Sequence, residues 1–247
     1  MGDHPPSARG QRAFVSQAQA IERLGQSAVV TVEQARAFWE SEEEMYRVDS
    51  VPFSVENLSR CAKENERGHQ WRLVWVLGLK PLQIVCKIRM PSRLMTPMTG
   101  SLSGPDTIVI MEKFEPTFCM GGANFIIKAA NEQWAFGSQR RGWRLIDFKP
   151  RFPRLNWNQQ EALLASESPV LTRAHDRDVL EAMFVIAGTT GEDLLAYHSH
   201  WGYPRAKEAN PIIIGTNSEG VYVISTFPET VEFYDWLGVC AEIAPET

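Results

Sequence analysis

The spacing of apolar residues predicts three helices in the first part of the chain, over residues 11–24, 32–46 and 55–67. In the first segment, apolar side chains recur every three or four positions, which is typical of a helix with one buried face. Thr31 and Gln34 form a capping-box pattern at the start of the second helix. Ser54 is a suitable N-terminal cap for the third.

Apolar runs bounded by Gly, Pro or polar residues predict strands, at residues 71–77, 143–148, 211–215, 221–226 and 237–243. The Gly-ended segment 216–220 predicts a hairpin between the two strands that flank it. Residues 107–111 and 124–129 are further short strand candidates. Over the eight residues 81–88, periodicity does not distinguish a helix from a buried strand.

Two later helices and one long loop complete the pattern. Asn156 predicts a helix from Trp157 to about residue 165. A second helix is expected over residues 172–187, with Gly188 as its end. Residues 90–106 are rich in Gly and Pro, which predicts a loop.

From about Trp143 onward, the predicted order is strand, helix, helix, strand, hairpin, strand. This order favours an antiparallel or mixed sheet with helices packed on one face over a doubly wound parallel sheet. We therefore expect an α+β fold with a helical N-terminal part. The expected organisation is a flexible tail at residues 1–10, a helix-rich region at 11–138 and an α+β domain at 139–247.

Composition changes this picture little. The 247 residues are 44% hydrophobic and 22% charged, enough to bury a core without disulfides. The four cysteines include no C-x-x-C pair, which argues against a zinc knuckle or a disulfide framework. No apolar run approaches the roughly 20 residues that cross a bilayer. We expect a soluble cytoplasmic protein with no membrane partner.

His198 and His200 are the densest pair of candidate metal ligands in the chain. In an extended strand, residues two apart point to the same face, so both imidazoles could converge on one ion. The His-Ser-His sequence resembles the motif of the JAB/MPN metalloproteases, which continues with a Ser and an Asp ligand. Those two later positions are Glu208 and Pro211 here, so the resemblance does not include the third ligand. The alternative interpretation is that the histidines form local hydrogen bonds at a strand end.

A basic stretch at residues 139–157 stands out from an otherwise acidic chain. It has a net charge of +5, whereas the whole chain has −5. Its arginines are interleaved with aromatic residues, a pattern that suits pairing with phosphates and stacking on bases. The candidate binding residues are Arg140, Arg141, Trp143, Arg144, Arg151, Arg154 and Trp157, together with Tyr197 and Trp201 beside the histidine pair. The alternative is that the arginines are solvated and bind nothing.

Short segments at residues 71–74, 156–161, 200–202 and 237–241 are similar to parts of uncharacterised bacterial proteins. This resemblance covers most of the chain after Asn57 and would make the protein bacterial. It implies no activity and therefore assigns no catalytic residue.

Three functional hypotheses follow from these observations. The first is a soluble, non-enzymatic binding or interaction protein without a cofactor, whose partner is another protein or an anionic ligand. The second is a metal-dependent hydrolase that uses a divalent ion held by His198 and His200. The third is binding of RNA or single-stranded DNA through the basic stretch at 139–157.

Overall fold

The computed structural model describes most of the chain in nine segments, residues 14–41, 50–81, 84, 141–192, 194–195, 199–202, 212–217, 220–225 and 237–246. The predicted tail at 1–10, the loop at 90–106, the strand candidates at 107–111 and 124–129, and most of segment 81–88 lie outside the described residues. None of the helices in the described part is long and apolar enough to cross a membrane.

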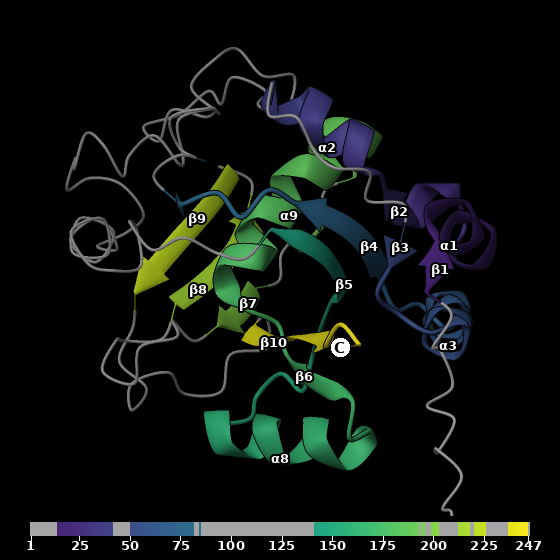
Figure 1. The fold of residues 1–247 in the computed structure, drawn as a ribbon. Helices are drawn as coiled ribbons and strands as arrows, with labels where there is room; N and C mark the ends of the chain where they lie inside the picture. Colours follow the sequence, from purple (N-terminus) through teal and green to yellow (C-terminus); the bar gives the residue numbers. More distant parts are fainter. Residues whose placement is uncertain are drawn as a thin grey trace, which may run out of the picture.

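Eight strands of the described part form one mixed sheet, which confirms the α+β class (Figure 1). Along the sheet, the order is β2 (Val29–Val30), β4 (Trp71–Val76), β5 (Gly142–Arg151), β10 (Leu237–Ile243), β7 (Ser199–Gly202), β8 (Ile212–Asn217) and β9 (Gly220–Ser225). Strand β6 (Leu171–Arg173) pairs with β10 on a separate branch. The β2–β4 and β7–β10 pairs are parallel, and the other pairs are antiparallel. Strands β1 (Val15–Ser16) and β3 (Ser50–Val51) pair separately.

The sheet joins the two regions that the sequence separates at residue 138. Strand β4 from the first region pairs with β5 from the second along its whole length, from Trp71 opposite Asp147 to Val76 opposite Gly142. The buried apolar residues of both regions belong to one cluster. The described parts of the two regions therefore share one core.

The described residues form five α-helices, α1 (Gln17–Leu24), α2 (Val32–Trp39), α3 (Val55–Glu66), α8 (Trp157–Glu167) and α9 (Asp176–Thr190). The expected caps are present at α2, where the Thr31 and Gln34 side chains each bond to the other's backbone, and at α3, where the Ser54 hydroxyl accepts from Asn57. Helix α2 ends at Trp39, earlier than expected, with Glu40 in a left-handed conformation.

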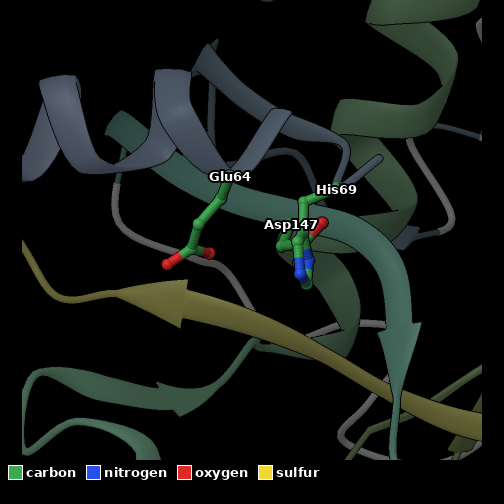
Figure 2. A group of neighbouring side chains, drawn as sticks. All are labelled: Glu64, His69 and Asp147. Carbon is green, nitrogen blue, oxygen red and sulfur yellow. The ribbon is translucent and has the colours of Figure 1, made fainter. Parts of the chain in front are cut away.

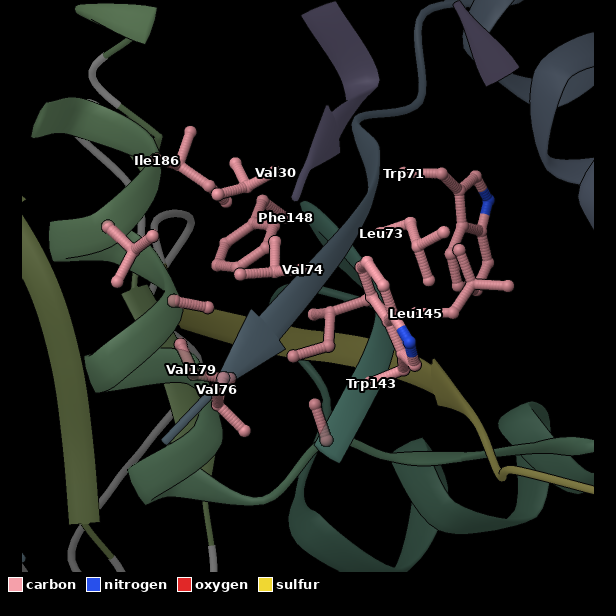
Figure 3. Packing of buried hydrophobic residues seen from close by; sticks show 14 of the residues in the cluster. Val30, Trp71, Leu73, Val74, Val76, Trp143, Leu145, Phe148, Val179 and Ile186 are labelled. Carbon is pink, nitrogen blue, oxygen red and sulfur yellow. The ribbon is translucent and has the colours of Figure 1, made fainter. Parts of the chain in front are cut away.

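The sheet buries side chains on both of its faces (Figure 3). Val74, Val76 and Phe148 lie on the face covered by α9, together with Val179 and Ile186 of that helix. Trp71 and Leu73 lie on the other face. Because successive strand residues point to opposite faces, a strand buried on both sides is a nearly continuous apolar run, as the sequence of β4 is.

Two helix predictions are wrong at their starts. In the helix expected over 11–24, Val15–Ser16 form strand β1, and α1 begins only at Gln17. Residues 172–187 were expected to be one helix, but Leu171–Arg173 form strand β6 and α9 begins only at Asp176. The backbone of this segment pairs with β10, and the Ala174 amide donates to the Cys240 carbonyl at 2.9 Å. His175 then caps the helix. Local spacing does not reveal this start because the pairing strand lies about 70 residues further along the chain.

Gly238 of β10 passes so close to β5 that a side chain does not fit. A Cβ atom there would lie 2.6 Å from the Arg151 carbonyl oxygen and 2.9 Å from Pro150. We predict that Gly238→Ala lowers the free energy of unfolding by about 1–3 kcal/mol, because the backbone of β5 must move. Urea denaturation measures this change.

Gly188→Ala is the matched control. Its Cβ would lie 2.3 Å from the ring of Phe38, so a half-buried side chain and not the strand backbone has to move, and alanine favours the helix. An equal loss of stability in both variants would contradict the proposed role of the β5 backbone.

Candidate functional site

Strand β5 carries charged side chains into the interior of the protein. Arg144, Asp147 and Arg151 are all buried, although a buried charge is costly unless it is paired. Their partners come from α3, α8, α9 and β10. Two ionic clusters result, one around Arg151 and one around Arg144.

Arg151 is the centre of the first cluster. Its guanidinium Nη2 donates to Glu64 Oε2 at 2.8 Å and to Asp147 Oδ2 at 2.9 Å, and its Nη1 donates to Glu167. The guanidinium also lies over the ring of Trp71, whose indole N–H donates to Glu64 at 2.7 Å. The cluster therefore ties α3, β5 and α8 together.

Asp147 is the most deeply buried acid of this cluster. Its carboxylate lies 2.7 Å from His69 Nδ1 and accepts from the Gln70 amide at 2.9 Å and the Lys149 amide at 3.1 Å. Burial alone would raise the pKa of Asp147, but the hydrogen bonds from His69 and Gln70 and the charge of Arg151 outweigh it and hold the pKa below its usual value. Asp147 is therefore a carboxylate at neutral pH.

Glu64, His69 and Asp147 form a group that could hold a metal ion (Figure 2). One ligand atom of each lies within 4.8 Å of the others. However, Arg151 Nη2 is 2.8 Å from the Glu64 carboxylate, 2.9 Å from that of Asp147 and 3.3 Å from His69 Nδ1. The guanidinium thus takes the position that a cation would need in this conformation.

The second cluster lies beside the start of α9. Arg144 Nε donates to Asp178 Oδ2 at 2.8 Å and lies 4.0 Å from Glu242 Oε1. Burial raises the pKa of Asp178, and it raises the pKa of Glu242 to about 7. His175, the cap of α9, has its Nδ1 2.8 Å from the buried Asp176 carboxylate.

An open pocket of about 420 Å³ adjoins this cluster between α8 and β6. We call it the α8–β6 pocket. It is lined by Trp157, Glu161, Thr172, Arg173, Ala174 and His175. Strand β6 supplies Thr172 and Arg173, and α8 supplies Trp157 and Glu161.

Arg173 is the cation of the pocket. Its guanidinium carbon lies 3.4 Å from the centre of the Trp157 ring. Its Nε donates to Glu161 at 2.6 Å, and Nη1 and Nη2 both donate to Gln160 Oε1 at 3.2 Å. Burial lowers the pKa of Arg173 to about 10, so the side chain is still protonated at neutral pH.

A strained turn precedes the pocket. Phe152 and Arg154, between β5 and α8, have positive φ angles of 54° and 63°, a conformation that is costly for residues other than glycine. The buried Gln160 donates to the Phe152 carbonyl at 3.1 Å and accepts from Arg173. One amide therefore connects the strained turn to the pocket cation.

The basic stretch predicted from the sequence does not form one exposed surface. Trp143, Arg144 and Arg151 are buried, whereas Arg141 and Arg154 are exposed and Trp157 lines the pocket. Arg140 lies outside the described residues. Arg144 and Arg151 are therefore not on the surface, where a nucleic acid could contact them.

The predicted histidine pair is described only at His200. This side chain is buried in β7, and its Nδ1 accepts from the Cys240 amide at 3.0 Å. Burial lowers its pKa well below the usual value, so the ring is neutral. His198, Tyr197 and the side chain of Trp201 lie outside the described residues, so convergence of the two imidazoles stays a prediction.

Sequence reasoning missed Arg173, Glu161 and the Glu64–His69–Asp147 group. Arg173 and Glu161 are twelve residues apart, and Arg173 lies on strand β6, which the sequence assigned to a helix. The one local signal for the Asp147 group was Asp147 itself, a single acid within a basic and apolar strand. A buried acid needs partners, so this residue indicated that a buried polar cluster would form around it.

We predict that Asp147→Asn lowers the free energy of unfolding by about 3–5 kcal/mol at neutral pH, because it leaves Arg151 without its buried partner. The folded pKa of Asp147 is depressed, so its contribution is present above the unfolded pKa of 3.8 and is lost as the pH falls through the lower folded pKa. Urea denaturation from pH 7 to pH 2 should show the difference from wild type shrinking below about pH 4. The control is Glu22→Gln on the exposed side of α1, for which we expect no comparable loss.

Glu242 gives the opposite dependence on pH. Its folded pKa of about 7 exceeds the unfolded value of 4.5, so the folded state binds more protons between these values. Wild type should therefore lose stability relative to Glu242→Gln as the pH rises from 4.5 to 7, with no further change above that range. A difference in unfolding free energy that is constant with pH would exclude a buried, titrating Glu242.

Comparisons with protein families, with curated proteins and with solved structures found no match for this chain. No relative therefore indicates which of its residues are functional. The case for the α8–β6 pocket depends on its own geometry, which combines an open cavity, a buried cation and a strained turn.

Proposed function

We propose that this protein binds a small ligand carrying a carboxylate or phosphate group in the α8–β6 pocket, and that it acts by binding without catalysis. The observation that carries the proposal is the Arg173 guanidinium, whose side chain is buried, stacked on Trp157 and part of the lining of an open pocket. This extends the hypothesis of an anionic partner and assigns it a place in the fold.

The size of the pocket supports a small ligand. Its volume of about 420 Å³ is within the range of small-molecule sites, which is roughly 300–1,000 Å³. The lining combines an aromatic ring from Trp157 with polar groups from Thr172 and Arg173. Sites for small ligands commonly have this combination, in which apolar surface provides contact and a few polar groups fix orientation.

The fixed position of Arg173 supports an oxyanion as the recognised group. A guanidinium presents donors in a planar fork that matches the oxygen atoms of carboxylates and phosphates. Stacking on Trp157 and the bonds to Gln160 hold this fork in place before any ligand arrives. Little side-chain entropy is then lost on binding, which improves affinity.

The remaining polar groups of the pocket support binding over catalysis. Covalent catalysis needs a nucleophile within hydrogen-bond reach of a base. His175 Nδ1 faces the Asp176 carboxylate, and its Nε2 is buried. The Thr172 hydroxyl is directed to the Glu242 carbonyl at 3.4 Å. No nucleophile–base pair is therefore present among the lining residues that the structure describes.

Titration with acetate, benzoate and inorganic phosphate tests the proposal. Binding is followed through the NMR signal of the Arg173 Nε–H group, and affinity is measured by calorimetry. We expect at least one probe to shift this signal, and Arg173→Gln to weaken its binding about tenfold or more, because a hydrogen bond to a charged group is worth about 1.5–3 kcal/mol. Arg23→Gln, at an exposed arginine in α1, is the matched control and should leave affinity unchanged.

Two results would contradict the proposal. One is the absence of any shift of the Arg173 Nε–H signal with all three probes. The other is an equal loss of affinity in Arg173→Gln and Arg23→Gln, which would indicate unspecific attraction to positive charge. Circular dichroism and thermal denaturation establish that both variants are folded.

A further inference from the structure

The partners of the Arg173 guanidinium differ sharply in their exposure. Gln160 is fully buried, whereas the side chain of Glu161 is 45% exposed. The Arg173 side chain itself is only 6% exposed. On its inner side, the Arg173 guanidinium contacts the Gln160 amide and the Trp157 ring. On its outer side, it pairs with the Glu161 carboxylate, which is accessible to water.

The ion pair with Glu161 is therefore the easiest of these contacts to replace. Water reaches the Glu161 carboxylate and can solvate it when it leaves Arg173, whereas Gln160 is fully buried. The bonds from Nη1 and Nη2 to Gln160 and the stacking on Trp157 do not depend on Glu161. Arg173 would keep its position if the Glu161 side chain turned outward into solvent.

Building on the proposed function, we propose that Glu161 is an internal competitor in the α8–β6 pocket and that the ligand's recognised group is a carboxylate which displaces it. The Glu161 carboxylate already accepts from Arg173 Nε at 2.6 Å and lines the pocket. A ligand carboxylate that takes over this bond exchanges one planar, singly charged acceptor for another of the same geometry. No other contact of Arg173 has to change.

The charge that remains in the pocket selects between carboxylate and phosphate. After displacement, Glu161 stays on α8 close to the ligand because it is part of the chain. Like charges repel, and a phosphate carries roughly −1.5 to −2 near neutral pH, so it is repelled more strongly than a carboxylate with −1. The single positive charge of Arg173 also does not neutralise a dianion. The competitor therefore favours singly charged carboxylates.

Glu161→Gln tests this inference because it removes the negative charge while keeping the shape of the side chain. We expect acetate and benzoate to bind about fivefold more tightly than to wild type, because the ligand no longer has to break the ion pair between Glu161 and Arg173. A fivefold gain corresponds to about 1 kcal/mol. We expect the affinity for inorganic phosphate to rise more than that for acetate, because the repulsion removed is larger.

The NMR signal of Arg173 Nε–H provides a second readout. Without ligand, the signals of wild type and Glu161→Gln should differ, because Nε donates to a carboxylate in one and to an amide in the other. With saturating benzoate, they should converge, because the ligand is then the acceptor in both proteins. A purely structural role of Glu161 would not produce this convergence.

Glu167→Gln is the matched control. Glu167 is also an acid of α8, its side chain is 39% exposed, and it pairs with a buried arginine, Arg151, away from the pocket lining. We expect this variant to bind carboxylates as wild type does. A gain equal to that of Glu161→Gln would show that the effect comes from the net charge of α8, and would overturn the inference.

The outcomes separate the two proposals. If carboxylates shift the Arg173 signal equally and bind with equal affinity in wild type and Glu161→Gln, the internal competitor is refuted and ligand binding at Arg173 stands. If neither protein binds any probe at Arg173, both proposals are refuted. Comparison of thermal denaturation curves establishes that Glu161→Gln is folded.

Discussion

Strand β5 brings two arginines and an aspartate into the interior of the protein, and the surrounding elements are arranged to neutralise them. A buried charge without a partner would cost several kcal/mol, so the acids of α3, α8 and α9 have to reach β5 in the folded state. Arg151 alone joins Glu64, Asp147 and Glu167. These contacts constrain how the helices lie against the sheet, together with the apolar packing of the shared core.

The α8–β6 pocket is a consequence of this arrangement. After Arg151, the chain turns sharply through two residues with positive φ, forms α8 and returns as β6 beside β10. Gln160 links that turn to Arg173, so the cation of the pocket is positioned by the same segment that closes the Arg151 cluster. The pocket is thus supported from β5 on one side and from the start of α9 on the other, where His175 adjoins the Arg144 cluster.

Local patterns predicted much of the fold. The caps at Thr31, Ser54 and Asn156, the β8–β9 hairpin and the bounds of β10 depend on neighbouring residues, so they could be predicted from the sequence. Strand β6 was missed because its identity depends on pairing with β10, which comes much later in the chain. The candidate site was missed for the same reason. Nothing near Arg173 in the sequence indicates that its guanidinium will lie over Trp157. The arginines and aromatic residues of β5 alternate in a pattern typical of a binding surface, but the arginines of this strand are buried.

Arg151 also has a consequence for how the protein is maintained. Three potential metal ligands surround a cation that is covalently part of the polypeptide. A bound ion can be removed by chelators or exchanged for another element, and its occupancy follows its supply. A guanidinium cannot be removed by a chelator or exchanged for another element, and it stays protonated at any physiological pH. In this conformation, the charge that joins α3, β5 and α8 is therefore supplied by the chain itself.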